Sequence, residues 1–181
     1  MRKVVLYQLM SLDGVAEEPG DWMYGADDTM YANLATVIGT QTDVLLGRGT
    51  YDYWSGYWPT ADEEPFASFI NGTTKHVFTS TTPNVEWPHS TFVDTPAEEY
   101  VAELKRGEGG DVGIHGSIRL AQSLVAAGLV DELRLVVSPA LADGGRQGLN
   151  GIAGTQRWEL LDSSSTSDGQ LLLGYRLSDQ A

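Results

Sequence analysis

The sequence contains no cysteine, so disulfide bonds, thiolate chemistry and cysteine-ligated metal sites are excluded. Its three histidines are scattered without the spacing of metal ligands, and we expect no zinc or iron site. Basic residues are also scarce, since 11 lysines and arginines stand against 25 aspartates and glutamates, giving a formal charge of −14. Such a field repels polyanions, so nucleic acid and anionic membranes are not expected partners. Any bound phosphate must therefore be held by a few local basic side chains and backbone N–H groups.

Long apolar runs are missing as well, and no segment approaches the roughly 20 residues that span a bilayer. The opening MRKVVLYQLMSLDG begins like a signal peptide, but Gln8 interrupts its apolar run, Asp13 ends it, and no small-x-small cleavage site follows cleanly. We interpret it as a first β-strand and expect a cytoplasmic protein. The length of 181 residues suits a single domain over residues 1–181.

Strand-like and helix-like patterns alternate over the first 138 residues. Strands are predicted at 3–10, 44–47, 76–81, 90–95, 111–116 and 130–141, and two more at 157–163 and 170–177. Helices are predicted from Asp27 or Asp28 to Ile38, within 64–72, and at 96–107 and 117–128. The alternation predicts an α/β fold, a single-domain three-layer sandwich whose mostly parallel central sheet ends in antiparallel C-terminal strands.

Three predicted strands end in the glycine- or hydroxyl-rich sequences GRGT, FTST and IHGS. In parallel sheets, ligands bind at the carboxyl ends of the strands, so these three exits are expected to share one rim. In the first exit, Gly47 and Gly49 permit a close backbone approach, and the planar fork of Arg48 suits a phosphate. The alternative is that Arg48 is a solvated turn residue and that Thr50 only caps the following helix.

The other two exits offer hydroxyls and free backbone donors. Thr79 and Ser80 could donate to a phosphate monoester, although such clusters are often ordinary loops. Gly116 and Ser117 lie at a strand-to-helix junction, where free N–H groups and the helix dipole favour a pyrophosphate. No strand exit carries G-x-G-x-x-G, and the Walker sequence is missing, which disfavours an ATPase.

In combination, these motifs resemble the dihydrofolate reductase superfamily, and more closely its branch related to the reductase (C-terminal) domain of bifunctional riboflavin-biosynthesis enzymes. SLDG at 11–14 is similar to that branch's signature, and GRGTY resembles the superfamily's Gly-Arg-x-Thr turn. IHGSIRLAQSL followed by LVDELRLVVSPALADGG resembles its late nucleotide-binding junction and the next strand. The resemblance extends from Val4 to about Leu177 and implies a dihydrofolate reductase-like fold and an NADPH-dependent reductase.

The resemblance also implies a set of cofactor-binding residues, with Arg48 as the charge partner of the adenosine 2′-phosphate. Those expected at the phosphates are Gly47, Arg48, Gly49, Thr50, Thr79, Ser80, Gly116, Ser117, Ile118 and Arg119. Those expected near the nicotinamide are Gln8, Asp13 and Gly14.

The sequence departs from the riboflavin-type reductases at the substrate side. Tyr7 stands where they carry a lysine, and the stretches TYDYW and GIHG do not clearly retain two of their acids. Asp13 and Asp27 are the candidate catalytic acids, with a tyrosine or water as alternative proton donors, and helix capping explains Asp27 equally well. We expect hydride transfer to a small heteroaromatic, pterin- or pyrimidine-like substrate. The alternatives are an NADP(H)-binding protein without turnover and a flavin- or deazaflavin-dependent reductase.

Aromatic residues cluster around the first helix–strand unit. Trp22, Tyr51 and Trp54 are candidates to wall a pocket for a flat ring. The alternative for most of these aromatics is the core or a dimer interface. The apolar stretch LLLGYRL, together with the family resemblance, predicts a homodimer.

Overall fold

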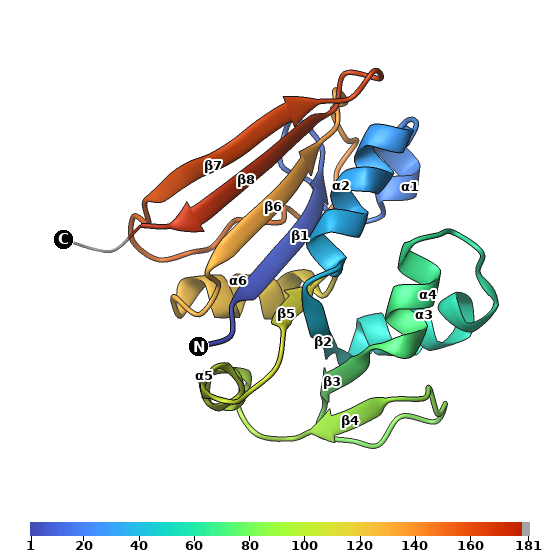
Figure 1. The fold of residues 1–181 in the computed structure, drawn as a ribbon, viewed down its shortest axis with the longest axis vertical. Coiled ribbons are helices and arrows are strands. Elements are labelled where there is room, and N and C mark those ends of the chain that lie inside the picture. The colour runs from blue at the N-terminus through green and yellow to red at the C-terminus, as the bar shows by residue number, and fades with distance from the viewer. Residues whose placement is uncertain (179–181) are drawn as a thin grey trace.

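The centre of the molecule is one eight-stranded sheet (Figure 1). The computed structural model describes residues 1–178. The parallel strands are β1 (Val4–Met10), β2 (Gln41–Gly47), β3 (Thr74–Phe78), β4 (Ser90–Val93), β5 (Asp111–Ile114) and β6 (Glu132–Val137). The C-terminal strands β7 (Trp158–Ser165) and β8 (Leu171–Leu177) are antiparallel to each other, and β8 pairs antiparallel with β6. The strand order is β4-β3-β2-β5-β1-β6-β8-β7, and the expected sheet architecture is confirmed.

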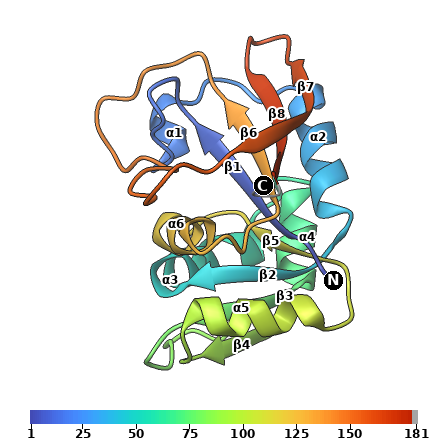
Figure 2. The same ribbon diagram turned by 90° about the vertical axis from the view of Figure 1, so that its left-hand side faces the viewer.

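Helices cover both faces of the sheet and give the expected three layers (Figures 1 and 2). They are α1 (Pro19–Trp22), α2 (Asp28–Ile38), α3 (Arg48–Tyr57), the 3-10 helix η1 (Trp58–Thr60), α4 (Phe66–Gly72), α5 (Ala97–Arg106) and α6 (Ile118–Ala126). Side chains alternate across a strand, so Val5 and Tyr7 of β1 join the core under α2, α3 and α4. Val4 and Leu6 of the same strand join the core under α5 and α6.

Several elements differ in detail from the sequence-based expectation. The segment 11–22 contains the short helix α1 where only a loop was expected. Helix α3 begins at Arg48, directly after β2, so Thr50 lies inside its first turn. The N-cap is Gly47, and the prediction that Thr50 caps this helix is wrong. Strand β3 ends at Phe78, which leaves Thr79 and Ser80 beyond the sheet.

Asp27 is the N-cap of α2, because its carboxylate accepts the Met30 N–H at 3.0 Å. This confirms the capping role that was the alternative to a catalytic one.

Within residues 1–178, no helix is both long and apolar enough to cross a membrane.

Candidate functional site

The three glycine- and hydroxyl-rich exits lie side by side at one rim of the sheet. Strands β3, β2 and β5 are consecutive in the strand order and parallel, so their carboxyl ends point the same way. The exit of β1 follows, because β1 pairs with β5 on its other side. The expected convergence of the exits is therefore present.

Ser117 joins the exits of β2 and β5. Its Oγ accepts the Gly47 N–H at 2.8 Å and donates to Thr50 Oγ1 at 2.8 Å. The backbone of Ser117 is left-handed, with φ 62°, a conformation that costs an L-residue about 1–2 kcal/mol. This bridge holds the first turn of α3 against the start of α6.

The N-termini of α3 and α6 are open to an anion. Gly47, the N-cap of α3, has no side chain, and Ser117, the N-cap of α6, directs its hydroxyl to the β2 exit. In the described part of the chain, no side chain caps either helix. The first N–H groups of a helix carry partial positive charge and need acceptors. Two such ends, joined through Ser117, are a suitable arrangement for a phosphate or pyrophosphate.

Arg48 connects the exits of β2 and β3. Its Nη1 donates to Thr81 Oγ1 at 2.7 Å and lies 3.4 Å from Thr79 Oγ1, while Nε donates to the Asp52 carboxylate at 2.8 Å. Ser80 is exposed beside them. The guanidinium thus lies beside the two threonines, and Asp52 already compensates part of its charge; its contact with the adenosine 2′-phosphate stays a prediction.

The glycines of this rim have different roles. A Cβ on Gly116 would lie 3.1 Å from Trp54 Cζ2 and 3.3 Å from Thr50 Cγ2, so Gly116 permits close packing of the β5 exit on α3. A Cβ on Gly49 would meet no atom within 4 Å, which leaves the start of α3 open to approach. Ile118 and Arg119 form the first turn of α6, and Arg119 is exposed.

Gln8, Asp13 and Gly14 lie at the exit of β1. Gln8 is buried, its Oε1 has no partner among the described residues, and its amide packs so closely on Gly148 that a Cβ there would lie 2.6 Å from Nε2. Asp13 accepts from Ser11 Oγ at 2.6 Å and from the Ala142 N–H at 3.1 Å. These hydrogen bonds, first that from Ser11, lower the pKa of Asp13. Gly14 has φ +86° and accepts the Gly148 N–H through its carbonyl.

Asp27, the second candidate acid, ties α2 to the turn between β7 and β8. Besides the Met30 N–H, its carboxylate accepts the Ser167 N–H at 2.8 Å and the Ser167 hydroxyl at 2.7 Å. The pKa of Asp27 is lowered, chiefly by the Met30 N–H and then by Ser167. Asp13 and Asp27 are thus both stabilised as carboxylates, so each carries a proton less often at neutral pH than an ordinary aspartic acid does.

The three candidate pocket aromatics have separate surroundings. Tyr51 is fully buried, donates to the Val85 carbonyl at 2.8 Å and accepts the Trp87 N–H at 3.0 Å, so it is a core residue and not a pocket wall. Trp22 is nearly buried, yet it lines an open cavity of about 430 Å³ near α1. Trp54 is half-buried and packs edge-on against Phe66, above Gly116.

A group of buried polar atoms between α2 and α4 had no place in the sequence-based site. Tyr7 Oη, His115 Nδ1 and Gln41 Nε2 are shielded from solvent and have no partner among the described residues, while His115 Nε2 lies 2.7 Å from Gln41 Oε1. The rings of Phe66 and Phe69 lie 5.2 and 5.6 Å from that of His115. The sequence signals were the Tyr7 and GIHG departures from the riboflavin-type reductases, which did not show that Tyr7 and His115 come together.

Burial keeps both rings of this group neutral. It raises the pKa of the Tyr7 hydroxyl above its ordinary value and lowers the pKa of His115 to about 3. Their centroids are 5.9 Å apart. Unpartnered buried polar groups are rare and call for an explanation, for which a ligand is one candidate. No group of three or more metal-binding side chains occurs within residues 1–178.

The fold is that of the dihydrofolate reductase-like proteins. Dihydrofolate reductase from Enterococcus faecalis, solved in complex with NADP(H), aligns with a TM-score of 0.63 at 16% identity, over 98% of this chain and 97% of that one. Residues 2–172 match the RibD C-terminal domain, and the chain belongs to this family of reductase domains.

Further relatives agree with this family. Two proteins of Bacillus subtilis strain 168, described as uncharacterized proteins YwjB and YyaP, are 31% and 27% identical to this chain. The alignments cover 80% of this chain and 80% and 79% of the relatives. A pyrimidine reductase-like protein from Corynebacterium diphtheriae aligns with a TM-score of 0.69 at 15% identity, over 99% of this chain and 93% of that one. The Thermotoga maritima diaminohydroxyphosphoribosylaminopyrimidine deaminase/5-amino-6-(5-phosphoribosylamino)uracil reductase aligns with a TM-score of 0.70 at 17% identity, over 98% of this chain and 57% of that one.

Proposed function

We propose that this protein is an NADPH-dependent reductase of a small heteroaromatic substrate. The observation that carries the proposal is the pair of uncapped helix N-termini of α3 and α6, joined by Ser117 at the carboxyl rim of the sheet. In a chain with a formal charge of −14, such backbone donors are a means of holding phosphates without a basic surface. Membership of the RibD C-terminal domain family supports the same function.

The residues of the rim fit the parts of this coenzyme. The N–H groups of Gly49 and Thr50 in α3, and of Ile118 and Arg119 in α6, would hold the pyrophosphate. Arg48, beside Thr79 and Ser80, would hold the adenosine 2′-phosphate. Bound NADPH supplies the hydride, and the protein's task is to orient both reactants.

The buried polar group between α2 and α4 suits a flat substrate with hydrogen-bonding ring atoms. Neutral Tyr7 and the amide of Gln41 offer a hydroxyl and an N–H donor that have no partner among the described residues. With Nε2 donating to Gln41 Oε1, neutral His115 presents Nδ1 as an acceptor. The rings of Phe66 and Phe69 provide apolar walls beside it. Such polar atoms beside aromatic rings would fix the orientation of a substrate ring with adjacent N–H and C=O groups.

Coenzyme binding is tested by titration with NADPH and NADH, following the fluorescence of the five tryptophans. NADPH is expected to bind more tightly, and Arg48→Gln is expected to weaken NADPH binding about 10- to 100-fold, because a charge-assisted contact is lost. Arg106→Gln is a matched control, since Arg106 likewise pairs with an acid on its own helix, Glu103 at 2.7 Å. Equal weak binding of both coenzymes, or an unchanged affinity in Arg48→Gln, would contradict the proposal.

A second candidate is an NADP(H)-binding protein without turnover, which the structural roles of Asp13 and Asp27 favour. Following NADPH oxidation with dihydrofolate, pterins, quinones and aldehydes separates the two. Robust NADPH oxidation with any of them removes this alternative, and tight NADPH binding without NADPH oxidation in the presence of the panel supports it.

A further inference from the structure

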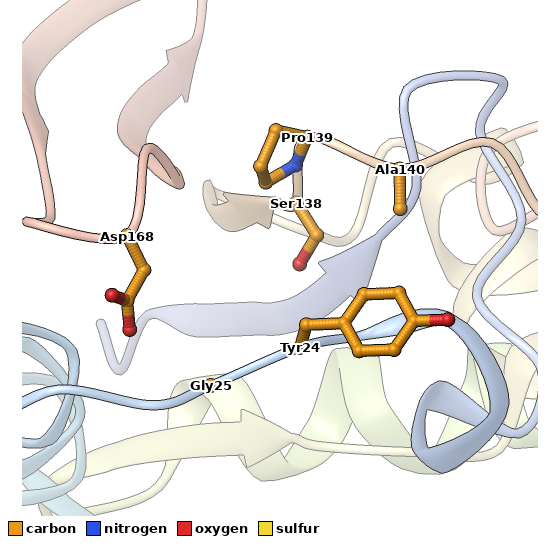
Figure 3. A pocket seen from close by; sticks show the side chains of 6 residues that line it. All are labelled: Tyr24, Gly25, Ser138, Pro139, Ala140 and Asp168. Carbon is orange, nitrogen blue, oxygen red and sulfur yellow. The ribbon is translucent and has the colours of Figure 1, made fainter.

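A cavity of about 290 Å³ lies at the exit of β6, next to the β1 exit on the same rim of the sheet, and none of its lining residues is among the proposed coenzyme-binding residues (Figure 3). Tyr24 and Gly25 line it from the connection between α1 and α2, and Asp168 lines it from the turn between β7 and β8. The remaining lining residues are Ser138, Pro139 and Ala140, which follow β6. None of these residues belongs to the proposed coenzyme site.

Ser138 places an unsatisfied hydroxyl in this cavity. The residue is 1% exposed, and its Oγ has no partner among the described residues. Its backbone is already paired, since its N–H donates to the Met10 carbonyl and its carbonyl accepts the Ala140 N–H. Figure 3 shows the hydroxyl pointing into the space above Tyr24. Because an unpaired buried hydroxyl is costly, a ligand atom that pairs with it would gain a hydrogen bond at little desolvation cost.

Asp168 provides the charge on the wall of the cavity that faces Ser138. Its carboxylate lies over Gly25, where a Cβ would be 2.5 Å from Oδ2 and where φ is +76°, so the approach depends on glycine. The Gly25 carbonyl accepts from Gln170 Nε2 at 2.9 Å, which holds this part of the wall in place. No lysine or arginine within residues 1–178 forms an ion pair with Asp168.

The surroundings extend the negative potential. The cavity of about 430 Å³ shares Tyr24 with this one. It is lined by four further acids, Glu17, Glu18, Asp21 and Asp143, of which Glu17 forms an ion pair with Arg146. Among the described residues, no lysine or arginine lines either cavity. Carboxylates on low-dielectric walls concentrate the field, so a cation is favoured over a neutral or anionic ligand.

We propose that this cavity binds an organic ammonium compound with an apolar body. The ammonium group donates to the Asp168 carboxylate and to Ser138 Oγ, which uses its acceptor lone pairs. The apolar body lies along the Pro139 ring and the face of Tyr24, where burial of its apolar surface adds to the carboxylate attraction. This binding site is independent of the proposed coenzyme and goes beyond the proposed function.

The probe is 2-phenylethylammonium, with 2-phenylethanol and 3-phenylpropionate as the neutral and anionic analogues, titrated into the full chain without coenzyme. Two-dimensional ¹H–¹⁵N spectra would locate binding through the backbone amides of Tyr24, Gly25 and Ala140. Saturable shifts at these amides are expected for the ammonium compound, with affinity at least about tenfold above that of the alcohol. Equal affinities of the three probes, shifts elsewhere only, or no binding at all would overturn the proposal.

Two variants and one control complete the test. Asp168→Asn is expected to weaken binding of the ammonium compound about 10-fold or more, and Ser138→Ala to weaken it about fivefold, as expected for a charged and a neutral hydrogen bond. Neither is expected to disturb the fold, since Asp168 is exposed and the Ser138 hydroxyl has no partner among the described residues. Glu108→Gln, which removes an exposed carboxylate between α5 and β5, is the matched control and is expected to bind normally. An unchanged affinity in Asp168→Asn would refute the site, whatever the outcome of coenzyme titrations.

Discussion

The bridge through Ser117 can be dissected by comparing Ser117→Ala with Ser117→Gly. Both variants remove the hydroxyl that accepts the Gly47 N–H and donates to Thr50 Oγ1, each at 2.8 Å. At about 1 kcal/mol for each hydrogen bond, the loss is about 2 kcal/mol. The two variants differ in the backbone, since φ at this position is 62°.

Glycine adopts this conformation freely, whereas alanine keeps the penalty of about 1–2 kcal/mol that serine already carries. The greater chain entropy of glycine in the unfolded state offsets about 0.5–1 kcal/mol of that advantage. Ser117→Gly should therefore be about 0.5–1 kcal/mol more stable than Ser117→Ala, and both should be less stable than the wild type.

Urea unfolding followed by tryptophan fluorescence measures these differences. For Ser117→Ala, a loss of about 2 kcal/mol lowers the midpoint by about 1 M urea at a typical slope. A midpoint equal to that of the wild type would show that the bridge contributes nothing to stability. A lower midpoint for the glycine variant than for the alanine variant would refute the argument from the left-handed backbone.

Four further predictions concern single residues and assembly. Burial lowers the pKa of Lys75 to about 8; because the unfolded state then binds more protons than the folded state, the free energy of unfolding should rise by about 2 kcal/mol between pH 8 and 10. This rise should be absent in Lys75→Met, and a parallel pH profile of the two proteins would contradict it. Tyr51→Phe should lower the free energy of unfolding by about 1–2 kcal/mol, since it leaves the Val85 carbonyl and the Trp87 N–H without their shared partner; unchanged chemical denaturation would argue against the core role. Asp27→Ala should lower the thermal midpoint of unfolding, whereas Asp27→Asn should keep it close to that of the wild type, because asparagine also caps helices. Equal midpoints for the alanine and asparagine variants would show that the cap of α2 does not account for the loss. The homodimer stays a prediction, which is supported by Leu160 and Leu161 in β7 and Leu171 in β8, exposed by 51%, 40% and 45%; sedimentation at the monomer mass of 19.6 kDa would exclude it.

The sequence predicted those parts of the fold that local patterns determine. Helix α2 could be bounded because Asp27 caps it and Leu34 and Ile38 recur on one face. Helix α5 carries acids in its first turn and Lys105 and Arg106 in its last, as the helix dipole favours. The placement of the β2, β3 and β5 exits on one rim also followed, because parallel strands direct their carboxyl ends to the same edge of a sheet. Their adjacency in the strand order was not predicted.

The remaining features depend on contacts between residues distant in the chain. Ser117 and Gly47 are 70 positions apart, and no local pattern shows that a serine hydroxyl will accept a glycine N–H from another strand. From the sequence, Tyr51 could be assigned to a pocket because its helix carries aromatic residues on several faces. Only the packing of Trp87 and Phe92 around Tyr51 shows that this face of the helix points into the core. The unpartnered atoms of Tyr7 and His115 likewise become visible only when β1 and β5 are adjacent.

The insertion of β5 between β1 and β2 has a consequence for the order in which the chain can fold. Until residues 111–114 have left the ribosome, β1 and β2 each present a bare edge, because β5 is the strand that fills the gap between them. The nascent N-terminal half is therefore exposed to wrong edge-to-edge pairing during synthesis. Ser117 follows β5 within a few positions, so the filling of the gap between β1 and β2 and the completion of the anion-binding rim depend on the same short stretch of chain.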